Sequence, residues 1–105
     1  MSKTILKNKD FLSLVLKGVA KQSRALLNTI SAEQTEALVE ILYNLGKIAS
    51  TKRDKGVIDK RRLMFKKLLN KKTALSKKVK LISKHKLQLL KTLNHFRGVL
   101  LSLIK

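Results

Sequence analysis

The apolar residues of this 105-residue chain recur at steps of three and four, the spacing of amphipathic helices. The clearest example begins at Ser31, where Leu and Ile follow one face and carboxylates follow the opposite face. Ser31 and Gln34 fit a capping box, in which the two side chains each accept a backbone N–H at the helix start. The pattern predicts a helix from Ser31 to about Gly46, with its apolar face in a core.

The same spacing predicts two short helices before Ser31. Residues 3–18 form the first, which is expected to stop at Gly18 because glycine is a common helix terminator. Residues 20–29 form the second, with Leu26 and Leu27 directed inward.

Two basic amphipathic helices are predicted after the central one. They span residues 57–72 and about 76–97, and Ser76 is the expected N-cap of the second. The polar segment Ser50–Gly56 between the halves contains Asp-Lys-Gly, which predicts a turn and a hinge. The apolar end after Gly98 either packs on the core or forms an exposed docking peptide. We favour packing, because exposed apolar ends promote aggregation.

Composition supports a helical protein with an aliphatic core. The chain has no proline, only four glycines and 4% aromatic residues, and such a chain rich in Leu, Lys and Ala favours helix. We therefore expect an all-α fold, a small bundle of about four to five helices with the last two strongly basic. Residues 1–50 and 51–105 form its two halves, within one folding unit.

Charge separates these halves. The net charge is +19, and most of it follows Thr51: residues 52–105 carry 18 basic and two acidic groups, whereas residues 1–51 carry seven and four. Such an excess opposes compact folding by self-repulsion. A polyanionic partner would neutralise it, either nucleic acid or an anionic membrane surface.

The predicted nucleic-acid-binding residues lie on the outer faces of the two basic helices. Lys and Arg at these positions can replace the cations condensed on phosphates. They are Lys60, Arg61, Arg62, Lys66, Lys67, Lys71, Lys72, Lys77, Lys80, Lys84 and Lys91. The last four are expected to form one stripe on the second basic helix, about 21 Å long at 1.5 Å per residue.

A second predicted surface is a protein-docking one. It consists of the acidic stripe Glu33, Glu36 and Glu40 on the central helix, and of Leu100, Leu101 and Ile104 near the end. In the free protein the stripe is also expected to attract the basic helices and so to shield them partly.

The sequence contains no pattern that indicates catalysis or cofactor binding. It lacks cysteine, a glycine-rich phosphate loop, a nucleophile elbow and HExxH. His85 and His95 are ten residues apart, which is the wrong spacing for a shared metal on one helix. No apolar run approaches the roughly 20 residues of a transmembrane helix, and the short run Phe11–Leu16 lacks the cleavage pattern of a signal peptide. We expect a non-enzymatic protein without cofactor or metal.

One stretch resembles a known family. The segment SRALLNTISAEQTEALVEILYNLGK, followed by a basic run and NKKTALSKKVKLISK, resembles short basic proteins of Polinton/Maverick elements and adintoviruses. The resemblance covers roughly residues 20–101 and is most specific from Arg24 to Gly46. The chain lacks the proline usual after the central helix, and has one glycine, Gly98, and no proline near its end. The resemblance implies a viral protein of the virion core, located in the virion interior and host nucleus; otherwise the chain is expected to be intracellular.

These observations lead to three hypotheses. The first is sequence-independent binding of nucleic acid, with duplex DNA favoured, to package or condense it in a virion. The second is a capsid-associated lining or cement protein that links the shell to the genome. The third is a membrane-active protein, and we rank it last because interfacial helices usually carry more aromatic residues. Homo-oligomerisation is left open.

Overall fold

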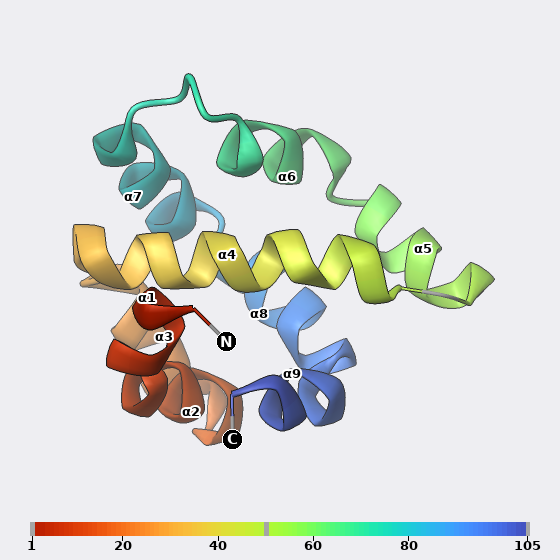
Figure 1. Cartoon of the computed structure of the whole chain (residues 1–105), viewed down its shortest axis with the longest axis horizontal. Helices are drawn as coiled ribbons and strands as arrows, with labels where there is room; N and C mark the ends of the chain where they lie inside the picture. The colour runs from red at the N-terminus through yellow and green to blue at the C-terminus, as the bar shows by residue number, and fades with distance from the viewer. Residues whose placement is uncertain (1, 50, 105) are drawn as a thin grey trace.

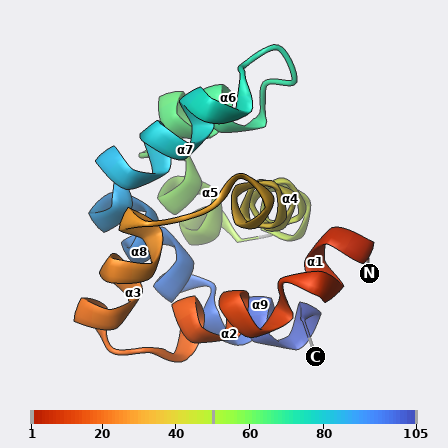
Figure 2. The same cartoon turned by 90° about the vertical axis from the view of Figure 1, so that its left-hand side faces the viewer.

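One long helix crosses the molecule, and the other helices surround it. The computed structural model describes residues 2–49 and 51–104. Helix α4 (Ala32–Ile48) runs through the middle in Figure 1, and Figure 2 shows it end-on with helices on several sides. The radius of gyration is 12.5 Å, close to the value of about 13 Å expected of a compact domain of this size.

The helices before α4 lie on one side of it, and those after it complete the shell. Every regular element of residues 2–49 and 51–104 is helical, which confirms the all-α prediction. The other helices are α1 (Lys3–Lys7), α2 (Lys9–Lys17), α3 (Ala20–Asn28), α5 (Lys52–Asp59), α6 (Arg62–Leu69), α7 (Leu75–Lys84), α8 (Lys86–His95) and α9 (Arg97–Leu103). Helices α6 and α7 form a hairpin across α4 from α1 and α2 (Figures 1 and 2).

The predicted number of four to five helices is wrong, since the described residues form nine. Four junctions account for most of the difference: Asn8, Arg61, His85 and Phe96. Their backbone angles are nearly the same, with φ between −104° and −113° and ψ between 15° and 25°. These values lie close to the sparsely populated bridge region. At Asn8, His85 and Phe96 a single residue separates two helices, and between α5 and α6 the two residues Lys60 and Arg61 do so.

The bend at His85 has a packing reason. A straight helix over residues 76–97 would be about 33 Å long at 1.5 Å per residue, as long as the longest extent of the whole molecule, 33 Å. Because the chain turns at His85, Ile82 on α7 and Leu89 and Leu93 on α8 all reach the core, each at most 1% exposed.

Caps decide where α4 and α5 begin. The Ser31 hydroxyl oxygen accepts the Gln34 N–H at 3.1 Å and the Gln34 Oε1 accepts the Ser31 N–H at 3.0 Å, so the predicted capping box is confirmed. The Thr51 hydroxyl oxygen likewise accepts the Asp54 N–H at 3.0 Å. This cap starts α5 where a hinge was predicted, so the turn prediction for residues 52–56 is wrong. Ser76 lies inside α7, whose N-cap is Ala74.

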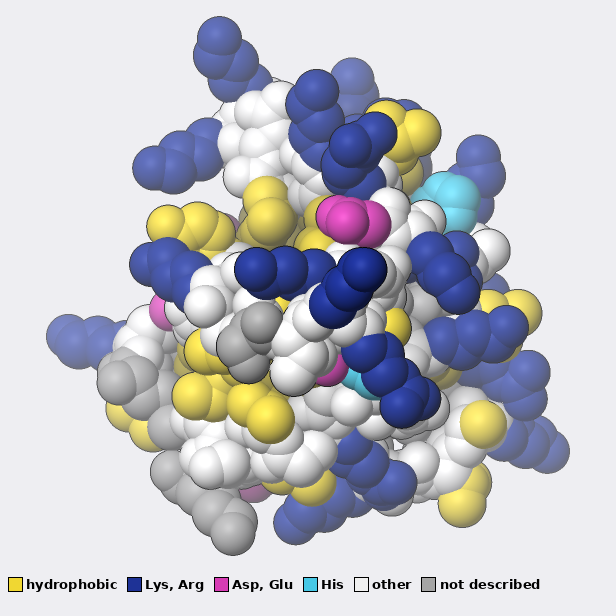
Figure 3. Space-filling model, turned by 90° about the vertical axis from the view of Figure 1, so that its right-hand side faces the viewer, with side chains coloured by type: hydrophobic (Ala, Val, Ile, Leu, Met, Phe, Trp, Pro, Cys, Tyr) yellow, Lys and Arg dark blue, Asp and Glu magenta, His cyan; other side chains and the backbone are white. Residues whose placement is uncertain are grey.

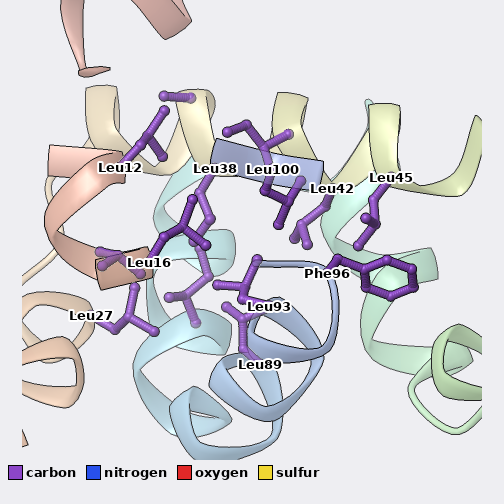
Figure 4. Packing of buried hydrophobic residues seen from close by; sticks show 14 of the residues in the cluster. Leu12, Leu16, Leu27, Leu38, Leu42, Leu45, Leu89, Leu93, Phe96 and Leu100 are labelled. Atoms are coloured by element: carbon purple, nitrogen blue, oxygen red, sulfur yellow. The ribbon is translucent and has the colours of Figure 1, made fainter. Parts of the chain in front are cut away.

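Both halves of the chain supply the core. Leu38, Leu42 and Leu45 of α4 are at most 1% exposed, and Figure 4 shows them facing Leu89, Leu93 and Phe96. Helix α4 contacts α1, α6 and α7, α3 contacts α7 and α8, and α2 contacts α9. The basic helices are therefore anchored in a core that they share with the N-terminal half.

The C-terminal residues join this core. Leu100 and Ile104 are 0% and 1% exposed, and α9 packs on α2. The favoured interpretation of the apolar end, packing on the core, is confirmed. Among the described residues, no helix combines the length and the apolar character that crossing a membrane requires.

Candidate nucleic-acid interface

Four lysines line a groove between the two helices of the α6/α7 hairpin. Lys67 of α6 lies on one side of it, and Lys77, Lys80 and Lys84 of α7 lie on the other. The groove has a volume of about 450 Å³, and Thr73 and Leu81 complete its lining. We call this feature the lysine groove.

The spacing on α7 explains the row of three lysines. Lys77, Lys80 and Lys84 follow one another at steps of three and four, which places them on one face of the helix. The opposite side of α7 carries Ile82, which is fully buried, and the partly buried Val79. An amphipathic segment therefore packs its aliphatic residues on the core and leaves the lysine row in solvent.

A second basic hollow lies where α5 meets α6. Its volume is about 350 Å³, and Lys60, Arg61 and Arg62 line it together with His85 and Gln88 from the α7–α8 junction. Asp59 is the acidic residue in its lining. We call it the corner hollow. Arg62 begins α6 and His85 directly follows α7, so this hollow lies at the open end of the hairpin, opposite the connection at residues 70–74.

A third groove separates the hairpin from α4. It has a volume of about 410 Å³; Glu36 and Glu40 of α4 line one side, and Lys71 and Lys78 line the other. Leu69, Leu75, Val39 and Tyr43 supply its apolar lining. We call it the mixed-charge groove. It brings two of the three predicted acidic residues beside the basic hairpin, but Glu33 is not part of its lining.

The predicted binding residues are exposed, but the structure does not gather all of them. Every one of the eleven is exposed except Arg61, which is partly buried. Their distribution is as follows: Lys67, Lys77, Lys80 and Lys84 in the lysine groove, Lys60, Arg61 and Arg62 in the corner hollow, Lys71 in the mixed-charge groove, and Lys66, Lys72 and Lys91 outside these three.

Lys91 leaves the predicted stripe because of the bend at His85. The prediction placed it in line with Lys77, Lys80 and Lys84 on one continuous helix. The structure puts it on α8, which packs against α3 and α5. A single row of four lysines about 21 Å long is therefore replaced by a row of three within one groove.

Few basic groups of the described residues have a carboxylate partner. In residues 2–49 and 51–104 one basic side chain, His95, lies within ion-pair distance of a carboxylate, with its Nε2 at 2.9 Å from Asp54 Oδ1. Figure 3 shows Lys and Arg side chains spread over the face that carries α5, with few acidic ones among them. The +19 charge of the chain is thus directed to solvent.

The His95–Asp54 pair links α8 to α5 and was not predicted. The two side chains are 23% and 27% exposed. The hydrogen bond from His95 is the main cause that lowers the pKa of the Asp54 carboxyl, and the Thr51 cap lowers it further. The two residues are 41 apart in sequence, and no local pattern connects them, so the sequence offered no signal for the pair.

The predicted docking residues divide by burial. Glu33 and Glu36 are exposed and Glu40 is partly buried. Leu100 and Ile104 are in the core and Leu101 is partly buried. Docking through Leu100 or Ile104 would require α9 to leave the core, because its buried face is already occupied.

The described residues do not gather a set of metal ligands. No group of three or more His, Asp or Glu in residues 2–49 and 51–104 is placed to hold a metal ion. Comparisons with protein-family models, with curated protein sequences and with solved structures find no match. The resemblance to short basic proteins of Polinton/Maverick elements therefore stays a prediction.

Proposed function

We propose that this protein binds nucleic acid without sequence specificity, through the basic surface of the α6/α7 hairpin and its junction with α5. The observation that supports this most strongly is that seven Lys and Arg side chains line two hollows of this hairpin. Cations presented in this way displace the counterions condensed along a phosphate backbone. Packaging or condensing duplex DNA in a virion is the finer form of the proposal, and it rests on the resemblance.

Two features favour nucleic acid over a membrane as the partner. The apolar sides of α6 and α7 face the core, with Phe65, Leu68 and Ile82 at most 5% exposed. Binding to a bilayer by these helices would need those residues in the lipid, and hence a loss of the fold. Phosphate binding uses only the side that already faces solvent.

The lysine groove has the features of backbone contact and not of base reading, because no Arg, Asn or Gln lines it. Lysine dominates the lysine groove, and a lysine ammonium is a point charge that contacts a phosphate without fixing a base. Sequence reading relies on bidentate contacts from Arg, Asn or Gln to base edges. We expect duplexes of different sequence to bind with the same affinity.

A salt titration tests the proposal. Anisotropy of a labelled DNA duplex is measured from 50 to 400 mM salt, with a duplex RNA and anionic liposomes in parallel. For six to ten phosphate contacts, log K should fall with log salt at a slope of about −5 to −9. A flat salt response, or tighter binding to liposomes than to either duplex, would overturn the proposal.

A further inference from the structure

We infer that the lysine groove is a discrete site for two to three closely spaced phosphates, and that it is the main contact site for a nucleic-acid strand. This inference rests on the proposed function, which it deepens: basic side chains occur on every helix, with most of them after Thr51, but the lysine groove gathers four of them without an acidic residue in its lining. The ligand chemistry is a run of phosphates, which a nucleic-acid strand or a compact polyphosphate can supply.

The dimensions of the groove match a run of phosphates. Lys77 and Lys84 are seven residues apart, which separates them by about 10.5 Å along α7. Phosphates of one strand of B-DNA are about 3.4 Å apart along the duplex axis and roughly twice as far apart along the strand itself, so a strand that lies in the groove places two to three phosphates within this span. Lys67 approaches from α6 across the groove, so a strand that lies in it is contacted from two sides.

The lining of the groove is suited to an anion. None of the residues that line it is acidic, and Thr73 adds a hydroxyl at the end nearest the hairpin connection. The corner hollow includes Asp59 and the mixed-charge groove includes Glu36 and Glu40. Of these three hollows, the lysine groove therefore has the most favourable field for a phosphate, since a nearby carboxylate would repel it.

The groove is also well anchored. Leu68 and Ile82, on the inner faces of the two helices that form it, are fully buried. Helix α7 packs on α4 and α3 as well as on α6. The four lysine backbones are held in place before any ligand binds, so less conformational entropy is lost on binding than for a basic tail.

Two variants of equal charge test the inference. The first changes Lys67, Lys77, Lys80 and Lys84 to Gln. The second, a matched control, changes four exposed lysines of α1–α3 to Gln, namely Lys3, Lys7, Lys9 and Lys21. Both lower the net charge by four, and all eight side chains are exposed, so circular dichroism should report the wild-type fold for each.

The first measurement uses duplex DNA. Loss of two to three phosphate contacts should make the salt slope shallower by about 1.8–2.7, which corresponds to about 30- to 160-fold weaker binding at 0.15 M salt. The control variant should keep the wild-type slope to within about one unit. Equal losses of DNA affinity in both variants would show that the net charge, and not the position of the lysines, determines binding. That result would overturn the inference of a discrete site while leaving the proposed function in place.

The second measurement uses inorganic tripolyphosphate, followed by isothermal titration calorimetry at low salt. The wild type should bind it saturably with a stoichiometry of one, the groove variant at least tenfold more weakly, and the control variant as the wild type does. Steep salt-dependent DNA binding without saturable tripolyphosphate binding would overturn the discrete site alone. Absence of DNA binding by the wild type would overturn the proposed function instead.

Discussion

Replacing Leu42 with Ala should destabilise both halves of the molecule together. Leu42 is 0% exposed and lies in the middle of α4, which contacts α1 and α2 on one side and α6 and α7 on the other. Leu-to-Ala changes at such sites cost about 3–5 kcal/mol, because they leave a cavity as well as losing apolar contacts. For a domain of about 100 residues, each kcal/mol lowers Tm by roughly 4–8 °C, so a fall of at least about 12 °C is expected.

The assay compares global and local stability. Thermal unfolding followed by far-UV circular dichroism gives the fall in Tm, and hydrogen exchange read by mass spectrometry reports on separate peptides. Leu63→Ala is the control, since it makes the same chemical change at a side chain that is 73% exposed; its effect should stay within about 0.5 kcal/mol.

Peptides from α6–α8 should lose protection in the Leu42 variant to the same extent as peptides from α2–α4. If α6–α8 kept wild-type protection while α2–α4 lost theirs, the halves would fold separately. The shared core would then be a contact between two stable units and not one cooperative unit.

Two further predictions concern charge. Glu36→Gln should tighten binding to duplex DNA at low salt, because it removes a carboxylate beside Lys71 and Lys78. The expected gain is about two- to fivefold, which matches the energies typical of exposed ion pairs, and added salt should erase it. Glu33→Gln, which lies outside that groove, should give a smaller gain in the same anisotropy assay. The pKa of Asp54 is lowered in the folded state, so its contribution to stability is present above the unfolded value of about 3.9 and is lost as pH falls through the folded value. The difference in Tm between the wild type and Asp54→Asn should therefore shrink as pH falls below about 5, and a constant difference down to pH 2 would contradict it.

The sequence predicted individual helices better than the bends between them. The central helix could be predicted because its cap, Ser31 with Gln34, and its apolar face are both encoded within a few residues. The bends at Asn8, Arg61, His85 and Phe96 could not be, because no proline or glycine occupies them; the one at His85 serves the packing of Ile82, Leu89 and Leu93 in the core. The hinge prediction failed for a related reason: Asp-Lys-Gly is typical of a turn, but the Thr51 cap and the packing of Val57 and Ile58 outweigh it.

The candidate site could likewise be predicted only in part. Composition and spacing identified most of its lysines, because exposure on an amphipathic helix can be inferred from the residues that must be buried. What the sequence could not provide was the grouping. Lys67 joins Lys77, Lys80 and Lys84 only because α6 folds back on α7, and Lys91 separates from them only because the chain turns at His85.

Helix α5 has a kinetic consequence for capture of a ligand. None of its residues is buried, it contacts α6 and α8, and Asp54 ties it to His95. Because only the partly buried Val57 and Ile58 of α5 pack against the core, local opening of this helix is expected to cost less free energy than opening of the buried helices. Opening would carry Lys52, Arg53 and Lys55 outward on a short tether. Under the proposed function, such a charged segment would enlarge the capture radius for nucleic acid and speed association, whereas the anchored hairpin would determine how long the complex lasts.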